Sequence, residues 1–302
     1  MSRLLLSIEA QDCNAWASDL VHGIPSPLSL ALYLRAIFCE NADLGFGTPS
    51  CFVLALRSVG HDRGSYSSRP LLTYIDPEKA SGSADPTPLF DEHRCSLHVQ
   101  LLVHTTQDPA LAAQPGQEQA ALRELERRLR FFRFLGGNVL AAGVQPAGSV
   151  DHVVRHLHGS RIYIDETAAV LQHSDDSLQA LRAALLANLD EHVQAAASAR
   201  WAIPQRLWEA VNGRWLRVMP LAYRRLSPLV HRPDARFVLD SARKPKPALH
   251  AFVESAYGFV ELLGPARAFD RNAMRNLWWS AAHPDSAPSA LAYSVQGTSH
   301  HE

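Results

Sequence analysis

The chain has 302 residues, a formal net charge of −1, a hydrophobic fraction of 47% and a charged fraction of 20%. These values are typical of a soluble globular protein with one large or two small domains. The sequence contains no apolar stretch long enough to span a membrane, and the apolar run near its start is too short for a signal peptide. We therefore expect a cytoplasmic protein that makes no contact with a membrane.

The nearly neutral total conceals two regions of opposite charge. Residues 200–246 carry eleven lysines and arginines against three acids, a balance of +8. Residues 165–199 carry one arginine against six acids, a balance of −5. One strongly basic region in a neutral protein is typical of polyanion binding, with the acidic surface kept away from that ligand. An arginine-rich codon usage is the alternative explanation, because lysines are rare throughout the chain.

The first part of the chain alternates strands and helices. Residues 4–9 are apolar enough for a buried strand, and residues 52–59 for a second one. Between them, Ser26 is a natural N-cap and Pro27 a natural first residue for a helix that extends to about residue 40. This helix is apolar on nearly all sides, which predicts that it is buried.

Residues 61–94 differ from the segments on either side, because they contain four prolines and many serines and aspartates. A loop of this length is uncommon unless it is functional. At its base, Arg63, Tyr66 and Arg69 offer phosphate and base contacts, whereas a plain surface loop is the alternative. Residues 96–105 then alternate apolar and polar side chains, which is the clearest strand pattern in the sequence.

Residues 118–134 predict an amphipathic helix that ends at a pair of glycines. Open backbone N–H groups at Gly136 and Gly137, beside Arg130 and Arg133, would suit a phosphate. The alternative for the glycines is an ordinary helix C-cap. Arginines also form a stripe along this helix, where i,i+4 pairs with glutamates would instead give an ion-paired, solvated face.

The expected order is therefore strand, helix, strand, excursion, strand, helix, strand, with the last strand at residues 139–144. This order predicts an α+β fold with the ferredoxin-like plan of many RNA-binding domains. We expect this core to occupy residues 1–164, with the excursion at residues 61–94.

The rest of the chain predicts an insertion and a segment that completes the fold. Residues 165–214 are expected to form a helical insertion, with helices at residues 175–199 and 204–211. Residues 215–281 are expected to complete the fold, beginning with a strand that leads to the basic pair Arg224–Arg225. The other expected elements are a strand at 161–165, a strand at 215–222, helices at 248–263 and 271–281, and a flexible tail at 282–302.

The sequence lacks the motifs of common catalytic and cofactor sites, such as a Walker loop, GxSxG or HExxH. His152 and His156 have the i,i+4 spacing of a metal pair, but no carboxylate or cysteine accompanies them in the required pattern. His22 could act as a general base in RNA cleavage, but nothing places an acid beside it. The cysteines, which form no CxxC pair and predict reduced thiols, are Cys13, Cys39, Cys51 and Cys95. We therefore expect no enzymatic activity, no cofactor and no metal site.

Short motifs across nearly the whole chain resemble one protein family in their order and spacing. They occupy residues 5–8, 23–27, 97–102, 135–140, 218–229, 252–254, 257–258 and 277–279. By these motifs the chain resembles the second Csy subunit of type I-F CRISPR surveillance complexes, a Cas-five-like member of the RAMP proteins. The resemblance implies a ferredoxin-like RAMP core with a thumb-like extension and an inserted helical region. The excursion departs from the basic thumb that we expect of the family, because it is acidic beyond Arg69.

The resemblance also implies a non-catalytic role in antiviral defence. Such a subunit holds the 5′ handle of the CRISPR RNA, and its protein partners are the large Csy subunit and the backbone Csy subunits. The residues that we expect to contact RNA are Arg63, Tyr66, Arg69, Arg130, Arg133, Gly136, Gly137, Arg224 and Arg225.

Two alternatives to this reading stay open. A RAMP-type endoribonuclease that processes CRISPR RNA shares the superfold, and an active His22 would identify it. In the minimal type I-F variant, which has no large subunit, this subunit also reads the target DNA duplex at the PAM. A neighbouring gene for a large subunit would distinguish the standard complex from that variant.

Overall fold

The computed structural model describes residues 2–14, 16–18, 21–22, 24–61, 94–106, 115–174, 176–187, 194, 203–214, 216–226, 230–231, 238–239, 245–246, 249–250, 253–270, 275–282 and 291–299. Within these ranges, no helix is both long enough and apolar enough to cross a membrane.

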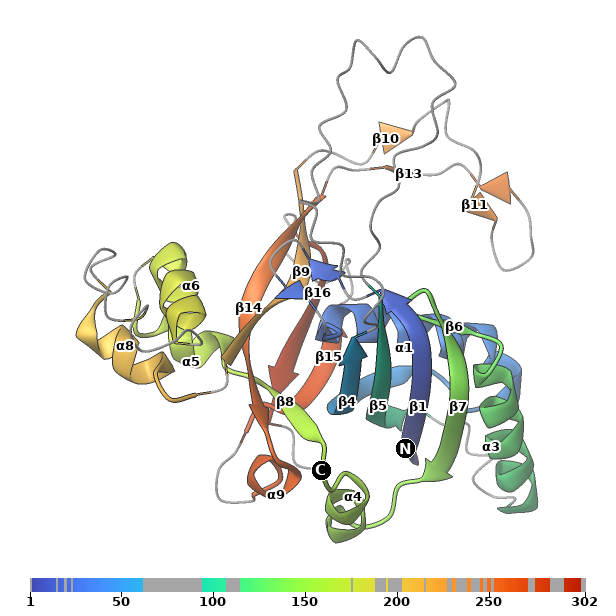
Figure 1. The fold of residues 1–302 in the computed structure, drawn as a ribbon. Helices are drawn as coiled ribbons and strands as arrows, with labels where there is room; N and C mark the ends of the chain where they lie inside the picture. The colour runs from blue at the N-terminus through green and yellow to red at the C-terminus, as the bar shows by residue number, and fades with distance from the viewer. Residues whose placement is uncertain are drawn as a thin grey trace.

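One large antiparallel sheet organises the described residues (Figure 1). Its strands are β1 (Ser2–Asn14), β4 (Pro49–His61), β5 (Arg94–Thr105), β6 (Arg133–Phe134), β7 (Gly137–Pro146), β8 (Arg161–Asp165), β9 (Leu216–Arg225), β14 (Val253–Leu263), β15 (Trp278–Ala282) and β16 (Leu291–Thr298). The strand order is β15-β16-β9-β14-β8-β4-β5-β1-β7-β6. Short paired strands outside it are β2 (Trp16–Ser18) with β3 (Val21–His22), β10 (Val230–His231) with β13 (Leu249–His250), and β11 (Val238–Leu239) with β12 (Pro245–Lys246). With the helices, this arrangement is compatible with the α+β class.

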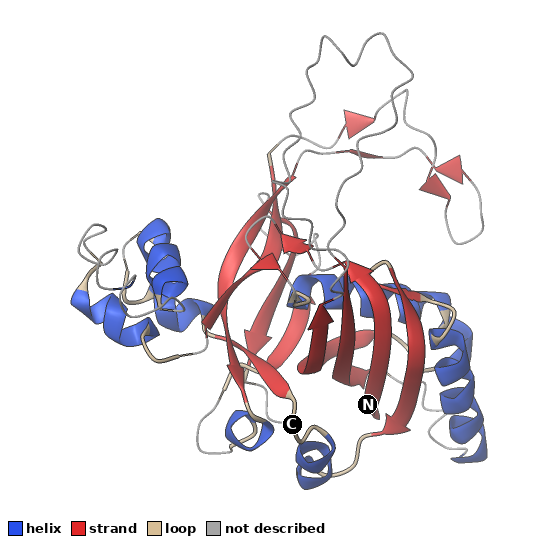
Figure 2. Ribbon diagram, viewed as in Figure 1, coloured by secondary structure: helices blue, strands red, loops and turns tan. Residues whose placement is uncertain are grey.

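Helices cover both faces of the sheet and one end of it (Figure 2). They are α1 (Pro27–Glu40), the 3-10 helix η1 (Ala42–Leu44), α3 (Pro115–Leu129), α4 (Val150–His156), α5 (Thr167–Leu171), α6 (Ser177–Leu186), α8 (Gln205–Val211) and α9 (Pro265–Ala268). In the first half of the chain, α1 connects β1 to β4, and α3 lies between β5 and β7. These four strands are neighbours in the order β4-β5-β1-β7.

The predicted first helix is confirmed, and its ends have clear local causes. The backbone N–H of Ser29 donates to the Ser26 hydroxyl at 3.1 Å, which satisfies one of the free donors at the helix start. At the other end, the side-chain amide of Asn41 donates to the carbonyl of Ile37 at 2.8 Å. The polar side chains of Ser26 and Asn41 thus bond to the free backbone groups at the two ends of the helix. Its apolar residues between them pack in the main core.

Alternation along β1 separates two cores. Leu4, Leu6 and Ile8 face α1 and α3 and belong to the main core cluster, which also contains Leu34 and Leu125 of those helices. Because neighbouring residues of a strand point to opposite faces, Leu5 lies in a second cluster beneath α4 and α9. The sheet is thus buried on both faces at this level.

In the second half, the strands curl until the sheet closes on itself. One edge of β4 pairs with β8 at Ala55 and also with β15, where Phe52 lies opposite Trp279. The ring β4-β8-β14-β9-β16-β15 is therefore complete. Trp279 is fully buried inside it, and its indole N–H donates to the carbonyl of Tyr163 at 3.1 Å.

Helices α5, α6 and α8 form a separate layer on β9 and β14. Their apolar residues share a third cluster with Leu216 and Val218 of β9 and Phe259 of β14. This layer lies on the far side of the molecule from α3 (Figure 1).

Three expectations for the C-terminal part were wrong. Residues 253–263 form strand β14 rather than a helix, because β14 lies between β9 and β8 and is buried on both faces from Phe259 onwards. A run that is buried on both faces shows no alternation and cannot be told from a helix by its period. Residues 278–282 form β15 instead of a helix, and residues 291–298 form β16 within the expected flexible tail.

A cluster of four charged side chains joins the helical layer to the ring. Arg214 donates to Glu261 at 2.7 Å and to Glu166 at 2.9 Å. Arg275 lies 3.9 Å from Glu166 and 4.0 Å from Glu261. Because the two carboxylates are almost fully buried, the hydrogen bonds from Arg214 and the nearby positive charge of Arg275 compensate for much of their lost hydration.

We predict that Glu261→Ala lowers the free energy of unfolding by about 2 kcal/mol, since it removes a buried, charged hydrogen-bond partner from the half-buried Arg214. Urea denaturation followed by tryptophan fluorescence measures the loss. Glu254→Ala is the matched control, because Glu254 also pairs with an arginine on β9 but in an exposed position. It should cost less than about 1 kcal/mol. Equal costs for the two variants would show that the buried cluster has no special role.

Candidate functional site

The structure describes some of the expected RNA-contacting residues and not others. Arg63, Tyr66 and Arg69 lie outside the described residues, so their assignment stays a prediction. The excursion leaves the sheet at the end of β4 and returns at Arg94, where β5 begins. His61 and Cys95 are direct partners in the ladder, so the two ends of the excursion are close together.

The glycine pair lies in a β-hairpin, so the expected end of the helix at these glycines and the alternative of a helix C-cap were both wrong. Helix α3 ends at Leu129, five residues before the expected position, and β6 and β7 follow as a hairpin. Leu135 and Gly136 are its two turn residues, with φ angles of 49° and 82°. Two consecutive positive φ angles are typical of a type I′ turn, which suits the twist of a hairpin.

This β6–β7 hairpin is tied to the far end of β1. The backbone N–H of Asn14 donates to the carbonyl of Leu135 at 2.9 Å. A Cβ atom at Gly137 would clash with the carbonyl of Gln11 and the backbone of Cys13. Gly137 is therefore buried against β1, whereas Gly136 is exposed. Of the two glycines expected to offer open N–H groups to a phosphate, only Gly136 faces solvent.

Two arginines of α3 serve the fold. Arg128 binds both carboxylate oxygens of Asp43 at 2.8 Å and Glu124 at 2.7 Å, so it fixes α3 to η1. Arg127 donates twice to Glu124, at 2.7 and 2.8 Å. These hydrogen bonds lower the pKa of the Glu124 carboxyl to about 2. The ion-paired interpretation of the arginine stripe therefore holds for this part of α3.

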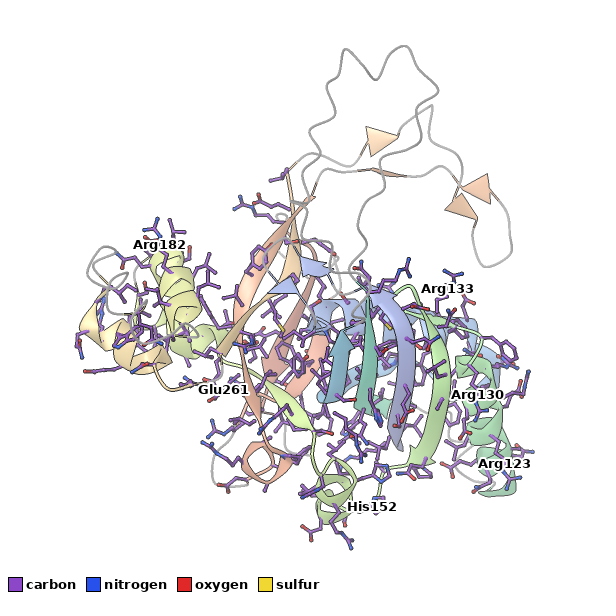
Figure 3. The ribbon with its side chains drawn as sticks, in the orientation of Figure 1. Arg123, Arg130, Arg133, His152, Arg182 and Glu261 are labelled. Carbon is purple, nitrogen blue, oxygen red and sulfur yellow. The ribbon has the colours of Figure 1, made fainter. Side chains whose placement is uncertain are left out.

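Three other arginines, on α3 and in the segment that leads to β7, have side chains exposed to solvent. Arg130 forms the expected i,i+4 ion pair with Glu126, at 3.3 Å, but its side chain is still 54% exposed. Arg123 and Arg133 are exposed and form no ion pair with any residue that the structure describes. Figure 3 shows all three on the same outer side of the molecule, along α3 and beside β6. We call Arg123, Arg130 and Arg133 the edge arginines.

The second basic pair lies elsewhere in the sheet. Arg224 is on β9, opposite Glu254 of β14, and the two side chains form an ion pair at 2.5 Å. Arg225 is the last residue of β9, and its side chain lies outside the described residues. Between β9 and β7 the sheet contains β14, β8, β4, β5 and β1, so the structure does not bring Arg224 to the edge arginines.

The expected histidine pair is on one helix. His152 and His156 of α4 have ring centroids 6.0 Å apart. In the described part of the chain, no three side chains of the metal-binding types lie together. His22 is in β3, but its side chain lies outside the described residues.

Two features escaped the sequence reasoning. Phe131, just beyond α3, is 78% exposed, although a large aromatic between two arginines was visible in the sequence. On the sheet face opposite α1, the Ser7 hydroxyl lies 3.0 Å from Nε2 of His98, and Glu9 lies 3.4 Å from its Nδ1. Burial lowers the pKa of His98, so its ring is neutral at neutral pH. Only the strand register reveals this set, because His98 is far from the other two in sequence.

We predict that Gly137→Ala destabilises the fold by about 1–3 kcal/mol, because the new methyl group meets backbone atoms of β1 that have no room to move. Thermal unfolding followed by circular dichroism measures the loss. Gly136→Asn is the control: nothing lies within 4 Å of its Cβ position, and asparagine tolerates a positive φ. A Gly136→Asn variant as unstable as Gly137→Ala would contradict this account of the hairpin.

A family model matches nearly the whole chain. The family model described as CRISPR-associated protein (Cas_Csy2) matches residues 4–288. No curated protein matches the chain significantly.

Proposed function

The chain belongs to the CRISPR-associated Cas_Csy2 family, and on that basis we propose that it is a non-catalytic, RNA-binding subunit of a type I-F surveillance complex. In this role it holds the 5′ handle of the CRISPR RNA and pairs with the large Csy subunit. The family supports membership of the complex, and the geometry below supports the RNA-binding role.

The topology of the first half supports a ferredoxin-like RAMP core. The order β4-β5-β1-β7, with α1 and α3 as connections on one face, is that of a β-α-β-β-α-β unit in which the first strand is central. Many RNA-binding domains use this plan. We therefore assign residues 2–146 to such a core.

One observation supports the RNA path most directly: the end of β1 brings two basic segments together. Asn14 pairs with Arg94, the residue at which the excursion returns to the sheet. The same residue bonds to the turn of the β6–β7 hairpin, which follows Arg130 and Arg133. The two ends of the excursion, at His61 and Arg94, thus lie near the β6–β7 hairpin that carries Arg133. A single RNA backbone can run from the excursion to the hairpin.

The helical layer has a different role in this proposal. Residues 165–199 have a balance of −5, which repels phosphate, and α5 and α6 lie on the far side of the sheet from α3 (Figure 1). We propose that this layer faces a protein partner or solvent. RNA then contacts only the opposite edge.

We predict that Arg130→Ala with Arg133→Ala weakens the binding of single-stranded handle RNA most at low salt. Each phosphate contact that is lost lowers the log–log salt slope by about 0.7, so the pair should lower it by about 1.4. Fluorescence anisotropy over a salt series measures the slope. Arg182→Ala, in the acidic helical layer, is the control with the same change of charge per residue. Because α6 lies far from the proposed path, its slope should not change.

The same titration tests the excursion through Arg63→Ala with Arg69→Ala. A lowered slope, with equal losses for altered handle sequences, is expected because phosphate contacts carry no base information. A salt slope that is unchanged in both double variants would show that the proposed RNA path is wrong.

The endoribonuclease of the same superfold is the second candidate, because His98, with contacts to Ser7 and Glu9, could act as a general base on a ribose 2′-hydroxyl. Ser7 and His98 are half-buried, but the Glu9 side chain is 53% exposed and offers little orientation. A ribonuclease also needs an acid for the leaving group. We therefore favour binding without cleavage.

We predict that the purified chain leaves repeat RNA intact at neutral pH over hours, as judged by denaturing gel electrophoresis. Specific cleavage that disappears in His98→Ala or His22→Ala would overturn the non-catalytic role in favour of the processing enzyme. Cleavage that persists in both variants indicates a contaminating nuclease, which a preparation of the double variant identifies.

A further inference from the structure

Phe131 is the most exposed large apolar side chain in the described part of the chain, and the only aromatic among those exposed. Single exposed apolar residues are common and need no explanation by themselves. Phe131 differs from the others in its surroundings, because it lies in the short turn between α3 and β6 with Arg130 before it and Arg133 after it.

The position of the ring is defined by ordered neighbours. The backbone N–H of Phe131 donates to the carbonyl of Arg128 at 2.9 Å, which continues the last turn of α3. The guanidinium carbon of Arg127 lies 5.8 Å from the ring centroid, a cation–π contact. Arg127 is itself held by two hydrogen bonds to Glu124. With 78% of the residue exposed, the ring surface away from Arg127 is open to solvent.

An aromatic ring fixed among arginines suits a ligand that combines a flat apolar face with negative charges. An unpaired nucleotide of RNA has this chemistry, with a base for the ring and phosphates for the guanidinium groups. An apolar protein segment would cover the ring but would offer nothing to the exposed charges of Arg130 and Arg133. The charge at this edge therefore favours RNA.

The sheet face does not offer a competing stacking surface. Ferredoxin-like RNA-binding domains commonly stack bases on aromatic residues of their central strands. Here the central strands β1 and β5 contain no Phe, Tyr or Trp, and Ser7, Glu9 and His98 occupy the uncovered part of that face. The His98 ring on that face is only 17% exposed and is contacted by Ser7 and Glu9, so Phe131 is the more open stacking surface among the described residues.

We propose that Phe131 is a stacking platform for one unpaired base of the bound RNA, with Arg130 and Arg133 holding the phosphates on either side of that nucleotide. This inference rests on the proposed RNA-binding function and names the contact that binds a base at this edge.

Phe131→Ala should weaken the binding of a synthetic RNA of the 5′ handle sequence by between about 5-fold and about 140-fold, the range for loss of one aromatic stacking contact. The salt slope should stay as in the wild type, because no phosphate contact is lost. Phe131→Trp should restore the affinity, since a larger ring stacks as well. Leu140→Ala is the matched control, because Leu140 is an exposed apolar residue on the neighbouring strand β7. The affinity of this variant for the RNA should equal that of the wild type.

Photocrosslinking gives a readout that a merely structural role would not produce. With 5-iodouridine in the handle RNA, the wild-type chain should crosslink at Phe131, and the crosslinked peptide is identified by mass spectrometry. Phe131→Ala should lose this crosslink while its unfolding temperature is unchanged, because the ring is exposed.

The outcomes separate this inference from the proposed function. If the wild type binds the RNA but forms no crosslink at Phe131, and Phe131→Ala binds the RNA equally well, the stacking role is wrong and the RNA-binding function stands. If the wild type binds no RNA, both are wrong. If Phe131→Ala keeps its RNA affinity but no longer copurifies with another Csy subunit, Phe131 is a protein contact and the inference is overturned.

Discussion

The close contact between the β6–β7 hairpin and the end of β1 organises the basic edge of this protein. Both ladders of β1 shift register there, between Ala10 and Cys13 toward β5 and between Glu9 and Ala10 toward β7. Asp12, within this irregular stretch, has a φ angle of 56°. The distortion leaves room for the hairpin only if residue 137 has no side chain. The positions of Arg133, Phe131 and the root of the excursion all follow from this fit.

A second constraint, the double use of β4, holds the two halves together. One edge of β4 pairs with β5 over its whole length, and the other pairs with β8 and β15. An unpaired strand edge can pair with strands of other chains and cause aggregation. Closure of the ring pairs the second edge of β4 within the molecule. The charged cluster around Arg214 then fixes the acidic helical layer on the side away from the edge arginines. The described acids of residues 165–199 thus lie away from the edge arginines.

Local signals in the sequence were enough for part of the fold. Helix α1 was predicted from Ser26, Pro27 and its apolar faces, and β8 from a short apolar run. Strand β14 was missed because burial on both faces removes the alternation that identifies a strand. The glycine pair was misread because a helix C-cap and a hairpin turn use the same residues, and contact with β1 decides between them. Likewise, only the partner Asp43, distant in sequence, separates the structural Arg128 from the edge arginines.

The pairing of Phe52 with Trp279 also sets the order in which the molecule can be made. About three quarters of the 302-residue chain separates these two residues, so one edge of β4 stays incomplete while the rest of the chain is translated. Contacts of such high sequence separation form late and slowly, since a long loop must close first. Until β15 and β16 leave the ribosome, the indole that fills the ring is missing from its interior. The last strands therefore complete the fold only after translation of nearly the whole chain. A protein truncated before Trp279 would lack the pairing of β15 with β4, and its sheet would not close into a ring.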